Sequence, residues 1–145
     1  MNEHTVISAS VASGGNVQTG TVAQPLRAVL RVEGLLLLAV AVLAYWRLGA
    51  GWGEFALLFF VPDLSFLGYL GGPRIGAIAY NCAHSLTGPM LLAGAGLAGS
   101  SSAFLPLAAI WVAHVGFDRM LGYGLKYAKG FGYTHLGRIG RAAGA

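Results

Sequence analysis

Ionisable side chains, among them two histidines and two aspartates, lie within long apolar stretches, where charged groups are rare. His114 and Asp118 lie four residues apart in the apolar stretch 104–125, so on a helix they share a face. Asp63 and His84 lie in two other apolar stretches. Placing such groups in hydrocarbon costs at least a few kcal/mol each, and chains that accept this cost generally use the groups. Imidazole together with carboxylate is a ligand set that zinc accepts.

Hydropathy predicts the elements that position these residues. The chain has 145 residues, of which 56% are hydrophobic and only 10% are charged, whereas soluble chains have ~25% charged residues. We therefore expect an all-α integral membrane protein, a four-helix bundle occupying residues 25–125. Its spans are predicted at about 26–46, 55–72, 75–98 and 104–125. Pro62 predicts a kink near the middle of the second span.

The two ends of the chain are polar or basic and lie outside the predicted spans. Residues 1–24 are rich in small polar side chains and show no periodicity, which predicts a flexible tail. Residues 126–145 are basic and aromatic, which predicts a cytoplasmic tail lying on anionic lipid headgroups. Nucleic acid is not an expected partner, because the basic groups are few and adjoin a span.

The distribution of basic residues predicts the orientation of the chain. Four spans place both termini on one side, and that side carries Arg27, Arg31, Arg74, Arg119 and the four basic residues of the C-terminal tail. The opposite side carries only Arg47. The positive-inside rule therefore predicts a multi-pass protein of the inner (plasma) membrane with both termini in the cytoplasm.

Helical rise predicts that several polar side chains meet at one depth. Asp63, His84 and His114 fall ~12, ~14 and ~15 Å from the starts of their spans. In a hydrocarbon core ~30 Å thick, all three lie near the midplane. A second polar layer is predicted nearer the cytoplasm, consisting of Glu33, Asn81, Asp118 and Arg119.

The leading hypothesis is a metal-dependent membrane enzyme, such as a hydrolase acting on a lipid-like substrate. Asp63, His84, His114 and Asp118 would bind a divalent metal ion, zinc being favoured. Glu33 and Asp118 are the candidate catalytic carboxylates, with Glu33 as the general base for a metal-activated water.

Each of these residues also has a purely structural interpretation. Glu33 could pair with Arg119 at the inner interface, and Arg119 could instead neutralise Asp118 or reach the headgroups. Asn81 could join helices by hydrogen bonding, and either histidine could be a satisfied residue of the bundle core.

Three other functions remain open on the sequence alone. The same residues could form a proton or ion relay, in which case four spans imply a homo-oligomeric carrier. His84 and His114 could be the two axial ligands of a haem. The polar layer could also lock the bundle of a structural or partner-binding membrane subunit.

Several motifs together resemble a known family, the small bacterial membrane proteins catalogued as domain of unknown function 4260. The motifs are RVEG at 31–34, VPDLSFLGYLGGPR at 61–74, YNCAH at 80–84, HVGFDRMLGYGLK at 114–126 and THLGRIG at 134–140. The resemblance implies four spans in a bacterial inner membrane, and it implies no activity. The motifs include the candidate residues Glu33, Asp63, Asn81, His84, His114 and Asp118. A looser similarity, in Pro62 and Asp63 with later histidines, links the chain to membrane-bound metal-dependent hydrolases, although their richer Asp and His runs are missing.

Overall fold

The structure, a computed structural model, describes residues 24–139 and is almost entirely helical. The all-α fold class predicted from the sequence is therefore confirmed for this part of the chain. Its elements are α1 (Gln24–Leu48), α2 (Trp52–Phe59), the 3-10 helix η1 (Val61–Gly71), α3 (Pro73–His84), α4 (Thr87–Leu97), α5 (Phe104–Leu121), and two short strands, β1 (Tyr133–Thr134) and β2 (Gly137–Arg138).

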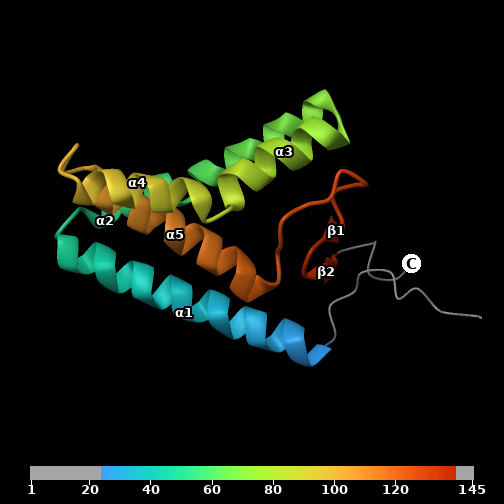
Figure 1. Cartoon of the computed structure of the whole chain (residues 1–145), viewed down its shortest axis with the longest axis horizontal. Coiled ribbons are helices and arrows are strands. Elements are labelled where there is room, and N and C mark those ends of the chain that lie inside the picture. Colours follow the sequence, from blue (N-terminus) through green and yellow to red (C-terminus); the bar gives the residue numbers. More distant parts are fainter. Residues whose placement is uncertain (1–23, 140–145) are drawn as a thin grey trace, which may run out of the picture.

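The helices form four antiparallel passes along the long axis of the molecule (Figure 1). Helix α1 is the first pass, α2 with η1 the second, α3 with α4 the third, and α5 the last. Helix α5 lies centrally, because it packs against α1 along most of its length and also against α4 and α2. The start of α1 and the segment after α5 lie at the same end of the molecule.

The third predicted span, 75–98, is not one helix. It is broken at Ser85, whose backbone is extended (φ −84°, ψ 154°), so α3 and α4 have only 12 and 11 residues. Pro89 explains the position of the break, because its nitrogen lacks the hydrogen that a continuous helix would donate to the Ser85 carbonyl, and its ring would clash there. Neither half reaches across a ~30 Å hydrocarbon core. The three helices long and apolar enough to do so are Pro25–Leu48, Trp52–Gly71 and Phe104–Leu121.

The second span changes helix type where a kink was predicted. Helix α2 ends at Phe59, and from Val61 the chain continues as a 3-10 helix with Pro62 in its first turn. The Asp63 amide donates to the Phe60 carbonyl at 3.1 Å, the i to i−3 bond of a 3-10 turn. Proline removes the donor that would continue the α-helix, and the tighter helix satisfies the neighbouring carbonyls.

Two glycines bring the backbones of α1 and α5 into direct contact. A Cβ atom at Gly34 would lie 2.5 Å from the Met120 nitrogen, and one at Gly116 would lie 2.6 Å from the Leu38 nitrogen. The Arg31 side chain then donates to the Met120 carbonyl at 2.8 Å, satisfying a free carbonyl at the end of α5. Close backbone approach at small residues is the usual way in which apolar helices associate without water. These contacts fix the position of α5.

We predict that Gly116→Ala destabilises the fold by about 1–3 kcal/mol, because the added methyl group has no space between the two backbones. The matched control is Gly94→Ala on α4, where a Cβ atom would meet nothing within 4 Å. The control should be neutral or slightly stabilising, since alanine favours helix. Thermal unfolding followed by circular dichroism in detergent measures both variants. Equal melting temperatures for the two would contradict the close contact between α1 and α5.

Candidate metal centre

Asp63, His84 and His114 come together from three different elements. One ligand atom from each lies within 4.8 Å of the others. The Nε2 atoms of His84 and His114 are 3.1 Å apart, and Asp63 Oδ1 lies 3.5 Å from the first and 3.6 Å from the second. The convergence expected from helical rise is therefore present in the structure. The His84 and His114 side chains are buried, whereas the Asp63 side chain is 36% exposed and forms the open side of the cluster.

The breaks in the second and third passes position two of these residues. Asp63 lies in the first turn of η1, and His84 is the last residue of α3, where Pro89 ends the helix. His114 lies inside the uninterrupted helix α5. The C-terminus of a helix carries partial negative charge, so the end of α3 favours a cation beside His84. Helix termini are a common source of ion sites because their backbone groups carry partial charge.

His84 is held in one orientation by Tyr80, one turn earlier on α3. Its Nδ1 atom lies 2.9 Å from the Tyr80 carbonyl oxygen, which has no hydrogen to give, so Nδ1–H donates. The two rings also stack, with centroids 3.7 Å apart and planes 12° apart. A neutral imidazole that donates through Nδ1 presents a bare lone pair at Nε2. His84 therefore directs a ligand-competent nitrogen at His114.

His114 completes the pair of nitrogens, and one of the two Nε2 atoms must carry a hydrogen or bind a metal ion. Its side chain is 1% exposed, its ring packs edge-on against Phe59, and its Nδ1 atom has no hydrogen-bond partner among residues 24–139. Two lone pairs facing each other at 3.1 Å would repel. One proton on His114 Nε2, or one metal ion in its place, removes that repulsion.

Asp118 lies at the edge of the cluster and is tied to it through Tyr80. Its Oδ2 atom lies 3.5 Å from His84 Nε2 and accepts a hydrogen bond of 2.9 Å from the Tyr80 hydroxyl. Tyr80 was missing from the residues predicted from the sequence. Its spacing of four residues from His84 could have indicated it, because that spacing places both side chains on one helix face.

Asn81 does not face the cluster and instead binds the segment that follows α5. Its side-chain amide donates to the Lys126 carbonyl at 2.9 Å, and the Lys126 amide donates to Asn81 Oδ1 at 2.7 Å. These two hydrogen bonds fix the segment after α5 against α3. Asn81 thus joins two parts of the chain by hydrogen bonding, the structural role considered for it from the sequence. Residues 1–23 and 140–145, which belong to the two predicted tails, lie outside the described residues.

Lys126 is buried, although its segment was predicted to lie on lipid headgroups. Its residue is 4% exposed, and its Nζ atom lies 3.8 Å from the centroid of the Phe131 ring and 4.9 Å from that of Tyr80. Phe131 in turn packs against Phe66 and Tyr69 of η1. The aromatic side chains of this segment thus hold the lysine over the Tyr80–His84 stack. Burial lowers the pKa of Lys126 to about 8, although the Asp118 carboxylate opposes the shift.

Glu33 and Arg119 lie in a different pocket from the cluster. This pocket has a volume of about 230 Å³ and is also lined by His135 and Leu136 of the C-terminal segment. The Glu33 residue is exposed on α1. The structure therefore brings together Asp63, His84, His114 and Asp118, and places Glu33, Asn81 and Arg119 around the C-terminal segment.

A family profile covers all of these residues, since it matches positions 27–139. The chain belongs to the family described as Domain of unknown function (DUF4260). No curated protein and no solved structure matches this DUF4260 chain. The family membership confirms the resemblance noted in the sequence motifs, and it carries no established activity.

We predict that Lys126 makes folding stability depend on alkaline pH. Its pKa is about 8 in the folded chain and 10.5 ordinarily, so between these values the unfolded chain binds more protons. Stability should therefore rise with pH from about 8 to 10.5, by roughly 1–3 kcal/mol relative to Lys126→Met. Below pH 8 both states are protonated and this contribution is constant.

The measurement is the melting temperature of wild type and Lys126→Met at a series of pH values, compared as a difference. Subtracting the variant removes the contributions of tyrosines and other groups that titrate in the same range. A difference that stays constant from pH 7 to 10.5 would contradict the burial of the Lys126 ammonium.

Proposed function

We propose that this protein is an integral membrane protein in which Asp63, His84 and His114 bind a divalent metal ion, as the centre of a hydrolase-like enzyme. The observation that carries the proposal is the direct contact of two buried imidazole Nε2 atoms, with a carboxylate oxygen beside both. Such a donor set suits a divalent cation between its members, and imidazole with carboxylate is a ligand set that zinc accepts.

Membrane insertion is supported by the surface of the helices as well as by their length. Large apolar side chains point outwards on the first three passes, and among them Leu57, Leu70, Leu91 and Leu97 of the second and third passes are 71–89% exposed. An apolar surface of this extent marks contact with lipid or with other chains. In a bilayer, the broken third pass is tolerated because its irregular backbone lies against protein, at the Trp111 contact described below.

An orientation with both termini in the cytoplasm of a bacterial inner membrane is part of the proposal. The start of α1, which carries Arg27 and Arg31, and the segment after α5, which carries Lys126, lie at the same end of the molecule, and the end of α1, which carries Arg47, lies at the other. This asymmetry supports the cytoplasmic assignment.

The cluster geometry fits zinc better than haem. With Zn–N bonds of ~2.0–2.1 Å, two tetrahedral ligands lie ~3.3 Å apart, close to the His84–His114 separation of 3.1 Å. Axial ligands of a haem lie on opposite faces of the macrocycle, and two nitrogens in contact leave no space for it. Three protein ligands with one open position are typical of catalytic zinc sites.

A metal ion bound here would supply Lewis-acid activation of a water molecule. Of the two carboxylates predicted to be catalytic, Asp118 is the better placed proton acceptor, because it lies beside the cluster and is oriented by the Tyr80 hydroxyl. Glu33 lines the other pocket and would need a large rearrangement to reach the same water. Asp63, on the exposed side, is positioned to meet a ligand that enters the site.

A proton relay is the second candidate function, because the hydrogen bond between the two histidines also suits proton transfer. Asp63, His84 and His114 would pass a proton between the open side of the cluster and its interior. This function predicts proton flux into proteoliposomes that Asp63→Asn abolishes, with no requirement for metal.

We predict about one zinc ion per chain in purified protein, measured by plasma mass spectrometry after dialysis against a weak chelator. His84→Ala and His114→Ala should each reduce zinc affinity by more than about 100-fold, because the site loses one of its two nitrogen ligands. His135→Ala is the matched control, since His135 lies outside the cluster and should retain full zinc content. Wild-type protein that folds normally and binds no zinc, or any other divalent metal, would contradict the proposal.

A further inference from the structure

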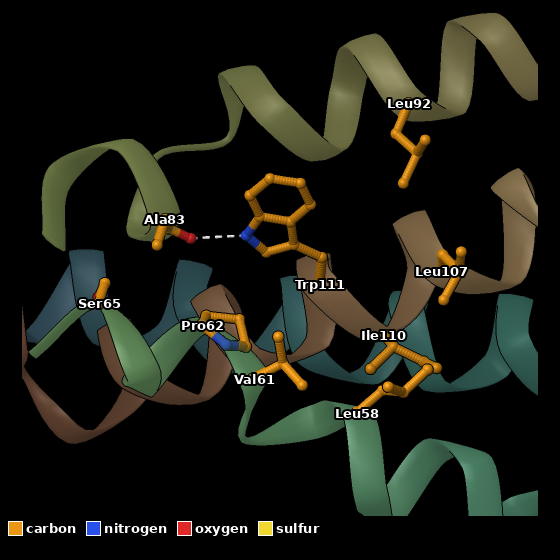
Figure 2. Close-up of a pocket in the computed structure, with 9 residues that line it drawn as sticks. All are labelled: Leu58, Val61, Pro62, Ser65, Ala83, Leu92, Leu107, Ile110 and Trp111. Carbon is orange, nitrogen blue, oxygen red and sulfur yellow. Dashed lines mark hydrogen bonds between the residues drawn. The ribbon is translucent and has the colours of Figure 1, made fainter. Parts of the chain in front are cut away.

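An apolar pocket lies where the second and third passes are broken (Figure 2). Its volume is about 360 Å³, at the small end of the range of ~300–1,000 Å³ for ligand pockets. Helices α2, η1, α3, α4 and α5 all contribute to its wall, through Leu58, Val61, Pro62, Ser65, Ala83, Leu92, Leu107, Ile110 and Trp111.

The pocket and the cluster share their supporting backbone. Pro62 directly precedes Asp63, Ala83 directly precedes His84, and Trp111 lies one helical turn before His114. Residues that line the pocket are thus the direct chain neighbours of two proposed metal ligands and lie one helical turn from the third.

Trp111 forms a fixed wall of this pocket. Its indole Nε1–H donates to the Ala83 carbonyl at 2.5 Å, as Figure 2 shows. In an unbroken helix Thr87 would donate to this carbonyl, so the break at Ser85 leaves it free and Trp111 satisfies it. The ring also fills the space beside Gly88, where a Cβ atom would lie 2.5 Å from it. The pocket is therefore preformed, with its wall locked on two sides.

Ser65 provides one polar group in an otherwise apolar lining. Its Oγ atom is buried and has no hydrogen-bond partner in the part of the chain that the structure describes. Buried hydroxyl groups are normally paired, so an unpaired one in a pocket indicates a ligand atom as its partner. Apolar walls with a few polar groups that fix orientation are typical of ligand sites.

We propose that this pocket binds the single hydrocarbon chain of an acyl amphiphile, whose carbonyl oxygen accepts a hydrogen bond from Ser65. The polar head then lies at Asp63, His84 and His114. This assignment rests on the proposed function and names its substrate class. The volume of about 360 Å³ suits one hydrocarbon chain rather than the paired chains of a membrane phospholipid.

The test uses the fluorescence of Trp111, which lines the pocket. Full-length protein carrying Trp46→Phe and Trp52→Phe retains Trp111 as its single tryptophan and is placed in phosphatidylcholine vesicles. The probe is the primary amide of a long-chain fatty acid with two bromine atoms at mid-chain, since bromine quenches a tryptophan that it touches. Quenching should saturate at a low mole fraction of probe. Phosphatidylcholine brominated at the same position should quench weakly and without saturation.

Two neighbouring residues on α4 provide matched variants. Leu92 lines the pocket, whereas Leu91 is 71% exposed and does not line it. Leu92→Phe should weaken probe binding by about 10-fold or more because it fills the pocket, and Leu91→Phe should leave binding unchanged. Ser65→Ala should weaken binding of the amide by about 2- to 10-fold and leave binding of a dibrominated alkane unchanged. Ser65→Ala also tests the assignment if Leu92→Phe does not fold.

The assignment is overturned if quenching rises linearly with probe, or if Leu91→Phe and Leu92→Phe behave alike. Saturable quenching by the brominated phospholipid would overturn it as well, because a bilayer lipid would then be the occupant. Zinc content is measured on the same samples. If the protein binds zinc but does not bind the brominated amide saturably, only the acyl assignment is wrong. If the protein binds the amide saturably but binds no metal, the proposed metal-dependent function is wrong.

Discussion

The contact between His84 and His114 is the constraint on which the rest of the structure depends. Two buried imidazoles 3.1 Å apart cannot both present lone pairs, so the fold must supply a proton or a metal ion between them. Tyr80 sets the orientation of one ring by accepting its Nδ1–H, and carboxyl oxygens of Asp63 and Asp118 each lie 3.5 Å from its Nε2 atom. An apolar helical protein retains such a group of side chains at a cost, which makes a role in function the natural explanation.

The helix breaks and the glycine contacts both serve this arrangement. Pro62 and Pro89 end regular helix at two places, and the irregular backbone carries Asp63 and His84 to the same point on α5. The backbone contacts at Gly34 and Gly116 hold α5 against α1 and so fix the position of His114. Trp111, from the same helix, satisfies a carbonyl that the second break leaves free. One pair of prolines thus accounts for the cluster and for the apolar pocket.

Much of this organisation could be predicted from the sequence. Hydropathy predicts the lengths of the apolar helices, and helical rise predicts how far along its helix each residue lies. They predicted the helices now seen as α1 and α5, and they placed Asp63, His84 and His114 at one level. Neither quantity predicts the direction in which a side chain points from its helix. Glu33 and Arg119 were therefore expected near the cluster, whereas they line a separate pocket. The break at Ser85 was also missed, because hydropathy does not depend on backbone hydrogen bonds. Pro89 has no backbone N–H to donate to the Ser85 carbonyl, and the helix is interrupted there.

The segment after α5 was the least predictable part, because its structure depends on contacts distant in sequence. The sequence predicted that the segment carrying Lys126 lies on lipid headgroups. In the structure Lys126 is buried, because its side chain packs on the Phe131 ring and its backbone binds Asn81, 45 residues earlier in the chain. The role of Tyr80 was not predicted for a similar reason. An aromatic residue is common in an apolar helix, and only the structure shows that its hydroxyl donates to Asp118.

X-ray absorption at the zinc edge, on protein given a single equivalent of zinc, tests the central claim most directly. The account predicts two imidazole nitrogens and one or two carboxylate oxygens at ~2.0–2.2 Å, with the outer-shell scattering typical of histidine rings. A spectrum with only oxygen ligands and no imidazole scattering would contradict it, because the metal would then lie outside the His84–His114 pair.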